Sequence, residues 1–444
     1  MEADTPAHIL LIILLGGALI FFGPRPWVLP AILALTVFVS MRFHVFVFGL
    51  NFYIARILLL LAWARVLIRG EHHGLRFLPM DRAFVLFAGS MVLVETLRRG
   101  WPGFVYASAN SFYDALGLYF LSRILLREAR DIKQVIASLA VICSVLAGFM
   151  LAERLTRHNF LTLLGASELV QGREGKLRCQ ATFSHPVLAG TYGAVLVPLF
   201  VACWWQGRGM KKLALAGTVA STIMAASSGS SGPIMTYAAV LAGLGFWPLR
   251  RSMRPLRWGI LLGLAALHLV MQAPVWALIA RASSLTGGGS GYHRFNLLDE
   301  FISHTADWWF LGIESTEGWG WLIDDVANTY CIIAKHGGLL ALVMFIRLLA
   351  AGFRQVGIAR NEAVNDRQTE ILVWAFGAVL FGHVVTFLGT SYFDQTGVLW
   401  YVTLAMLGSL HLLAAPEPET LEAASEEEVP IQDAIRGHQG ISLS

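Results

Sequence analysis

The residues best suited to chemistry stand directly before a long uncharged segment. KLRCQATFSHPVLAG, 176–190, carries Lys176, Arg178 and His185, and the following TYGAVLVPLFVACWW has no charged side chain. An arginine in this place suits an anion, because its planar guanidinium donates two hydrogen bonds to a phosphate and stays charged. The pattern indicates either an anion site at a membrane boundary or a cluster of solvated loop charges.

The composition is that of a membrane protein. Of the 444 residues, 56% are hydrophobic and 14% are charged, and the mean hydropathy is +0.62. Soluble domains carry about 25% charged residues. The apolar runs are continuous and about 20 residues long, enough for a helix to cross a bilayer, whereas barrel strands would alternate in polarity. We therefore predict an all-α, polytopic integral membrane protein in contact with membrane lipids.

Charge and cysteine usage argue against two other classes of site. The formal net charge of +4 is too small to indicate a nucleic-acid partner. No metal site is predicted, because the cysteines are scattered without the spacing of a metal-binding motif: Cys143, Cys179, Cys203 and Cys331.

The hydrophobic runs predict about 12 to 13 transmembrane helices, in a transmembrane domain that covers 1–415. They lie near 8–22, 27–41, 45–64, 82–97, 110–126, 134–152, 186–205, 212–227, 232–248, 258–277, 327–350, 370–389 and 396–414. Alternate connections are short and rich in Lys and Arg, which places them in the cytoplasm, the N-terminus outside and the C-terminus inside. The acidic N-terminus favours a retained anchor over a cleaved signal peptide. Residues 416–444 are predicted to form a disordered acidic cytoplasmic tail.

Two outward connections are long enough to suggest a function, at about 152–185 and at 278–326. The second is a large loop in which 294–310 predicts an amphipathic helix. Its apolar face is expected to hold Phe295, Leu298, Phe301 and Ile302.

Several polar groups fall on the outward side or inside the predicted membrane helices. SSGSSG at 227–232 is either a tight turn or a nest of backbone N–H groups for an anion. Lys335 and His336 lie roughly 12 Å beyond Asn328 along a helix, and ionisable groups at such depth face a polar cavity or a partner. Arg56 lies midway along its predicted helix. For Arg56 and Lys335, a structural ion pair or snorkelling is an equal alternative.

Residues 170–350 resemble the O-antigen ligase and O-antigen polymerase superfamily of bacterial inner-membrane proteins. RCQATFSHPVLAGTYGAVLVPL resembles the family's arginine and Phe-x-His-Pro approach to a helix, and SSGSSGP stands where the family has a serine-rich outer turn. GYHRFNLLDEFI is similar to the arginine-bearing start of its large periplasmic loop. FLGIESTEGWGW and DVANTYCIIAKHGGLLALVMFI resemble the glycine-rich end of that loop and the Asn-x-Tyr that precedes a helix.

The resemblance implies a GT-C-like fold and a metal-independent glycosyltransferase without a cofactor. Such proteins lie in the bacterial inner membrane and act on its periplasmic side. They transfer a saccharide from an undecaprenyl-pyrophosphate donor to a growing polysaccharide or another acceptor. In this chain Arg178 and Arg294 match the arginines that hold the pyrophosphate. The implied partners are a lipid-linked oligosaccharide donor, a polysaccharide acceptor and other polysaccharide-assembly proteins.

The sequence departs from the ligases at the residue before Asn328, where they carry a histidine and this chain has Ala327. Asp325 is the nearest replacement as the catalytic base. This departure favours a polymerase of an exopolysaccharide or a ligase to another acceptor. The remaining substrate-binding candidates are Arg173, His185, His293, Asn328, Tyr330 and His336, with His185 more suited to starting a helix than to catalysis.

Two other functions remain open from the sequence. A membrane transporter of an anion or a lipid-linked sugar would use intramembrane charges such as Arg56, Lys335 and His336. A non-catalytic partner in a polysaccharide machine would use the acidic tail for docking.

Overall fold

The computed structural model describes residues 6–47, 50–168, 170–173, 175–285, 290–320 and 326–414. Helices account for 77% of it, which confirms the prediction of an all-α protein. Asp325 and the predicted tail at 416–444 lie outside the described residues.

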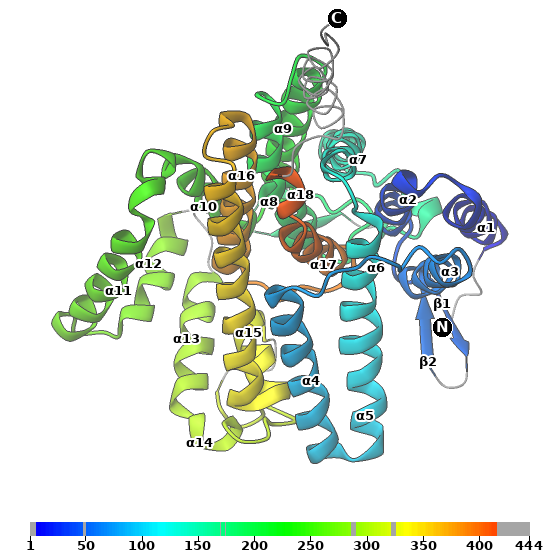
Figure 1. Cartoon of the computed structure of the whole chain (residues 1–444). Helices are drawn as coiled ribbons and strands as arrows, with labels where there is room; N and C mark the ends of the chain where they lie inside the picture. Colours follow the sequence, from blue (N-terminus) through cyan, green and yellow to red (C-terminus); the bar gives the residue numbers. More distant parts are fainter. Residues whose placement is uncertain are drawn as a thin grey trace, which may run out of the picture.

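Helices of different lengths follow one another along the chain (Figure 1). The α-helices are α1 (Ala7–Phe22), α2 (Arg25–Phe38), α3 (Ile54–Ile68), α4 (Pro79–Arg99), α5 (Trp101–Ala107), α6 (Leu118–Leu125), α7 (Ala129–Thr156), α8 (Pro186–Cys203), α9 (Met210–Ser227), α10 (Ser231–Gly245), α11 (Met253–Val270), α12 (Leu278–Leu285), α13 (Ser290–Ser303), α14 (Thr305–Trp308), α15 (Thr329–Glu362), α16 (Arg367–Thr386), α17 (Asp394–Gly408) and α18 (His411–Ala414).

Shorter elements connect them. A π-helix, η1 (Ser108–Gly117), joins α5 to α6, and the 3₁₀ helices are η2 (Thr162–Leu164), η3 (Trp247–Ser252) and η4 (Val275–Ala277). Two antiparallel hairpins pair β1 (His44–Val47) with β2 (Leu50–Tyr53), and β3 (Gln171–Arg173) with β4 (Lys176–Arg178). The first hairpin corrects the prediction of one helix over 45–64, because the helix begins only at Ile54.

Helix starts follow the chemistry of their first residues. Pro186 occupies the first turn of α8, where its missing N–H costs no hydrogen bond, and the His185 side chain accepts a hydrogen bond from the Val187 amide. The expectation that His185 starts a helix is confirmed. Asn328 and Asp366 cap α15 and α16 in the same way.

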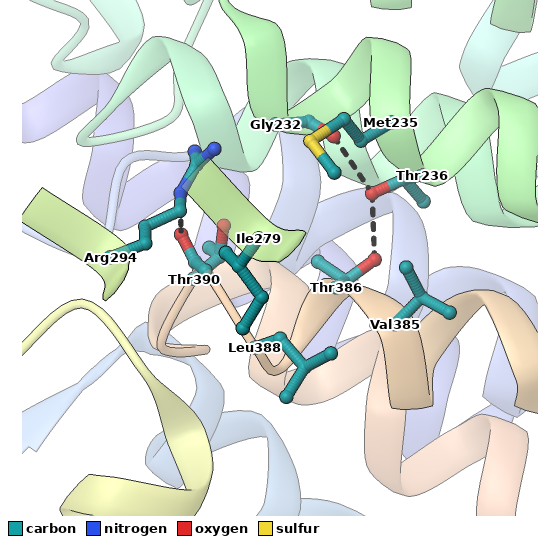
Figure 2. Close-up of a pocket in the computed structure, with 10 residues that line it drawn as sticks. Gly232, Met235, Thr236, Ile279, Arg294, Val385, Thr386, Leu388 and Thr390 are labelled. Atoms are coloured by element: carbon teal, nitrogen blue, oxygen red, sulfur yellow. Dashed lines mark hydrogen bonds between the residues drawn. The ribbon is translucent and has the colours of Figure 1, made fainter. Parts of the chain in front are cut away.

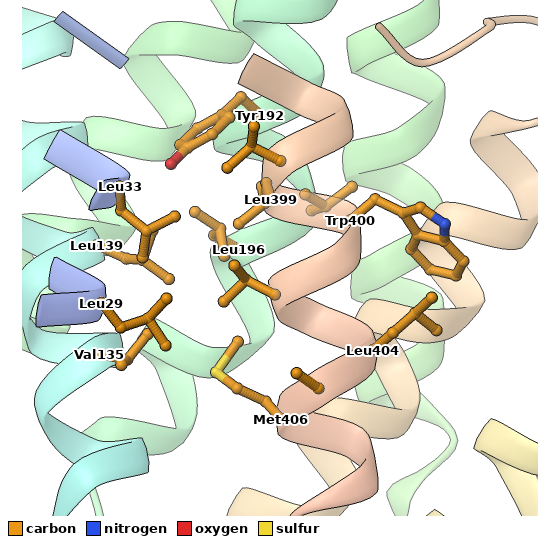
Figure 3. Packing of buried hydrophobic residues seen from close by; sticks show 14 of the residues in the cluster. Leu29, Leu33, Val135, Leu139, Tyr192, Leu196, Leu399, Trp400, Leu404 and Met406 are labelled. Atoms are coloured by element: carbon orange, nitrogen blue, oxygen red, sulfur yellow. The ribbon is translucent and has the colours of Figure 1, made fainter. Parts of the chain in front are cut away.

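The uncharged stretch after His185 is the central helix of the bundle. In α8, 89% of the residues are buried, and the helix packs against α9, α10 and α16. Tyr192 and Leu196 of α8 face Leu29 of α2, Leu139 of α7 and Leu399 of α17 (Figure 3). A helix enclosed on all sides has no face for a charge, which explains the sequence of this segment.

Among the described residues, four helices are long and apolar enough to cross a membrane: α7, α8, α15 and α16. A fifth arises if α10 and the segment Trp247–Val270, which meet at a bend of 68°, form one span. The chain is therefore a membrane-embedded helical protein. Helical segments occupy all the predicted ranges, but several are too short to pass the same test, so the larger number of spans stays a prediction.

The large loop is mostly helical where it is described. The predicted apolar face of α13 is only partly correct: Phe301 is buried, but Ile302 is 42% exposed, and Leu297, which was not predicted to lie on this face, is buried with Phe301. The buried pair packs with Cys331 and Ala334 of α15, because residues four apart lie on one side of a helix. Figure 1 shows α13 and α14 beside α15, and α11 and α12 standing out to one side.

The cysteines offer a test of orientation. All four are buried, and burial raises the pKa of the Cys179 thiol to about 12. Because the thiolate is the reactive form, the unmodified protein should not react with a membrane-impermeant maleimide in intact cells. Lys176 is exposed and lies on the side predicted to face outward, so Lys176→Cys should become labelled. The control Lys212→Cys, exposed on the side predicted to face the cytoplasm, should be labelled only after permeabilisation. The reverse pattern would show that the orientation is inverted.

Candidate functional site

Arg178 reaches the site from the end of the hairpin β3–β4. Its side chain is buried, and the guanidinium donates from Nε and Nη2 to the Ser230 hydroxyl, at 3.1 and 3.0 Å. The next residue attaches to the same turn, since the Cys179 amide donates to the Ser227 carbonyl at 3.0 Å. The end of the hairpin is thereby fixed onto the SSGSSG segment.

The SSGSSG segment is a tight turn between α9 and α10. Gly229 has φ +57°, and a Cβ there would stand 2.4 Å from the Leu177 carbonyl oxygen. Glycine is therefore required for both its backbone conformation and its close approach to β4. One of the two alternatives for this segment, a tight turn, is confirmed, while anion binding by its N–H groups stays a prediction.

Glu153, near the end of α7, holds the backbone of the segment that follows Arg178. Its carboxylate is 1% exposed and accepts hydrogen bonds from the backbone amides of Gln180 and Ala181, at 3.0–3.3 Å. Ala181 has φ +50°, which is strained for a residue with a Cβ and needs such support. Sequence reasoning missed Glu153; the available signal was a carboxylate near the end of a predicted membrane helix.

Arg294 approaches the same turn from α13. It is 8% exposed, and its Nε donates to the Gly389 carbonyl at 3.3 Å. A Cβ added to Gly232 would stand 3.3 Å from its Nη2. Arg178 thus meets the turn at Ser230 and Arg294 meets it two residues later. The structure brings together two arginines that are 116 positions apart in the sequence.

The loop between α16 and α17, which contains Gly389 and so contacts Arg294, is held in place by Asn328 and its neighbours. The Asn328 Nδ2 donates to the Leu388 carbonyl at 3.1 Å, and the Thr329 hydroxyl donates to the Thr390 carbonyl at 2.9 Å. The Tyr330 hydroxyl donates to the Val384 carbonyl at 3.0 Å. Asn328 is fully buried, so the geometry gives it a positioning role; direct substrate contact stays a prediction.

A pocket lies between α10, α12, α13 and the end of α16 (Figure 2). Arg294 and Thr390 stand at one side of it, and Thr236 and Thr386 are joined by a hydrogen bond of 2.6 Å across its floor. The remaining lining is glycine or apolar: Gly232, Met235, Ile279, Val385, Leu388 and Gly389. A pocket of this kind suits a ligand with both a charged and an apolar part.

The other candidates are distributed around this centre. His293 precedes Arg294 on α13 and is partly buried, and the backbone of Arg173 lies in β3. Among the described contacts, His336 pairs with Glu95 of α4 rather than with either arginine of the site.

Arg56 forms an ion pair. Its Nη2 lies 2.7 Å from the Asp114 Oδ2, and the Tyr53 hydroxyl donates to the same oxygen at 2.8 Å. The structural alternative for Arg56 is confirmed, since its charge is balanced by Asp114 of η1.

A search against protein-family models and a search of curated proteins found no match.

The turn can be tested by Gly229→Ala. The new Cβ would collide with the Leu177 carbonyl and force an unfavourable positive φ, so we expect the free energy of unfolding to fall by about 1–3 kcal/mol. Thermal unfolding in detergent would measure this. Gly245→Ala, in open space at the end of α10, is the matched control. Equal stability of the two variants would contradict the requirement for glycine.

Asp394 predicts a pH dependence of stability. Burial raises the pKa of this carboxyl, although the Ser184 hydroxyl, which donates to it, and the charge of Arg42 act in the opposite direction. Because the folded state binds the proton more tightly, its contribution to stability should fall as the pH rises through the raised pKa. Asp394→Asn should lose this part of the pH profile in denaturant titrations. An identical profile would exclude Asp394 as its source.

Proposed function

We propose that the protein is a polysaccharide polymerase or ligase that uses an undecaprenyl-pyrophosphate donor. The convergence of Arg178 and Arg294 on the turn before α10 carries the proposal. Two nearly buried guanidinium groups at a helix N-terminus attract a multiply charged anion and can donate hydrogen bonds to it. The resemblance of 170–350 to the O-antigen ligase and polymerase superfamily supplies the glycan chemistry.

The neighbouring pocket matches the other half of such a donor. Met235, Ile279 and Leu388 offer apolar contacts beside Arg294 (Figure 2). A polyprenyl pyrophosphate combines an apolar chain with a charged head. This arrangement supports a lipid-linked donor over a soluble nucleotide sugar, which has no apolar tail.

The proposed reaction exchanges one bond at the anomeric carbon. A hydroxyl of the acceptor glycan attacks that carbon and gives its proton to a base, for which we propose Asp325. The bond to the pyrophosphate oxygen breaks, and undecaprenyl pyrophosphate leaves with the bonding electrons. Arg178 and Arg294 stabilise the negative charge that develops on this leaving group, and preorganised donors do so at little reorganisation cost. The enzyme would bind the donor and the acceptor at the periplasmic face of the inner membrane.

Arg178→Gln and Arg294→Gln test this assignment in a deletion strain that expresses each variant. Loss of a charge-assisted hydrogen bond costs about 1.5–3 kcal/mol, so we expect roughly a 10- to 150-fold loss of transfer and shorter polymer chains. Arg154→Gln, an exposed arginine at the end of α7, is the control and should leave chain length unchanged. Full-length polymer from both test variants, at normal protein levels, would contradict the proposal.

Transport of a lipid-linked sugar is the second candidate, and one observation favours it. α15 is interrupted at Gly338, next to Lys335 and His336, and transporters place broken helices with polar groups at their substrate sites. Purified protein in liposomes, with a fluorescent lipid-linked oligosaccharide and no acceptor, separates the two functions. Translocation without transfer would support a transporter, and transfer after addition of the acceptor would support the polymerase or ligase.

A further inference from the structure

α15 consists of two helical parts separated by a break. Gly338 has φ 60° and ψ −164°, which is outside the helical region. The first part, 329–337, is capped by Asn328 and has Tyr330 in its first turn, and the second part continues to Glu362. A break leaves backbone carbonyls at one end and N–H groups at the other without helical partners, and inside a membrane protein these groups need replacements.

The end of the large loop supplies the replacements. The Ile313 amide donates to the Lys335 carbonyl at 2.7 Å, and the Leu339 amide donates to the Trp309 carbonyl at 2.8 Å. Gly312 makes this insertion possible, because a Cβ there would stand 2.2 Å from the Lys335 carbonyl oxygen. Residues 309–313 therefore fill the break from one side.

α4 closes the break from the other side through Arg98. Its Nη1 donates to the carbonyls of Ile313 and Lys335, at 2.6 and 3.0 Å, and so joins the inserted loop to the first part of α15. Its Nη2 donates to the Glu95 Oε1 at 2.6 Å. A guanidinium suits this place because its planar fork serves several acceptors and its charge is favourable at a helix C-terminus.

Glu95 connects Arg98 to the broken helix itself. Its carboxylate is 1% exposed, and the His336 Nδ1 lies 2.9 Å from the same Oε1 that accepts from Arg98. The second oxygen, Oε2, is buried without a hydrogen-bond partner among the described residues. One carboxylate thus receives an arginine from its own helix and a histidine from α15, which fixes the two helices in one register.

We infer that Glu95, Arg98 and His336 form a latch that positions the candidate site through the first part of α15. The latch holds the C-terminal end of the segment 329–337. The N-terminal end of this segment lies about 12 Å away along the helix, and there Asn328 and Thr329 hold the loop that contains Leu388 and Thr390. That loop accepts Arg294 at Gly389. Release of the latch frees 329–337 and removes the support of Arg294. The consequence for glycan transfer rests on the proposed function, whereas the latch itself does not.

Hydrogen exchange tests the latch without any assumption about activity. In the purified, lipid-reconstituted protein, Arg98→Gln should raise amide exchange at least tenfold in peptides that cover 309–313 and 384–390. Arg98→Lys should not restore protection, because an ammonium group lacks the planar fork. Arg99→Gln is the matched control: Arg99 is the adjacent residue and pairs with the exposed Glu314. Unchanged exchange at 309–313 in Arg98→Gln would overturn the latch.

Glu95→Gln keeps the shape of the side chain and serves as a second variant if Arg98→Gln does not fold. We expect faster exchange at 309–313 for it too, since its amide cannot provide the negative charge that Arg98 meets. Normal protection in Glu95→Gln would overturn the role of that carboxylate. If exchange becomes faster at 309–313 but stays unchanged at 384–390, the latch exists but does not position the site. That result would overturn the positioning part of the inference.

The link to Arg294 is tested by a double-mutant cycle with farnesyl pyrophosphate as the probe. Arg98→Gln should weaken binding of the probe about tenfold in the wild-type background and have little effect when combined with Arg294→Gln. Independent, additive effects would overturn positioning through Arg294. If Arg294→Gln itself leaves probe binding unchanged, the proposed function fails, while the exchange experiment still decides whether the latch exists.

Discussion

Polar groups enclosed by an apolar helix bundle must find their partners within the protein, and this constraint governs the whole molecule. Arginine meets it repeatedly by binding the carbonyls at the end of another helix. Arg65 donates to the carbonyls of Ile20 and Gly23 at the end of α1, and Arg123 donates to the Gly408 carbonyl at the end of α17. Each arginine also has a carboxylate nearby, Glu71 and Asp81 respectively. These contacts join segments that are distant in the sequence.

The candidate site uses the same chemistry for a different purpose. Arg178 and Arg294 bind a serine hydroxyl and a backbone carbonyl, and both lie against one turn. Gly229, Gly232 and Gly389 leave the space that the two guanidinium groups and β4 require. A pyrophosphate next to this turn would meet donors whose positions are already fixed, which is the condition for stabilising charge as it develops.

The break in α15 would serve a different purpose in each of the two proposed functions. A transporter would use the interrupted helix to bind and move its substrate, whereas a glycosyltransferase would use it to hold a wall of its active site. The contacts of Gly312, Ile313 and Arg98 fill the break with protein groups. This packing is more consistent with a positioning element than with a substrate site at the break itself.

The sequence by itself determined the class of protein and the positions of most helices. The absence of charge from 191–205 predicted a membrane-spanning helix, and His185 and Pro186 marked its beginning, because these signals are local. The order of motifs also selected Arg178, Arg294 and Asn328 as candidates, without showing that they share a site.

Only the tertiary structure decided how these residues are combined. Whether Arg178 and Arg294 lie against the same turn depends on how α10, α13 and the hairpin β3–β4 pack, and no local signal encodes that packing. The same holds for Glu153 and Glu95, which lie near the ends of apolar segments and carry no local signal of a partner in the sequence. The amides that Glu153 accepts from lie 27 and 28 positions away, and the His336 that pairs with Glu95 lies 241 positions away. Their roles therefore follow from the requirement that a buried charge be satisfied in three dimensions.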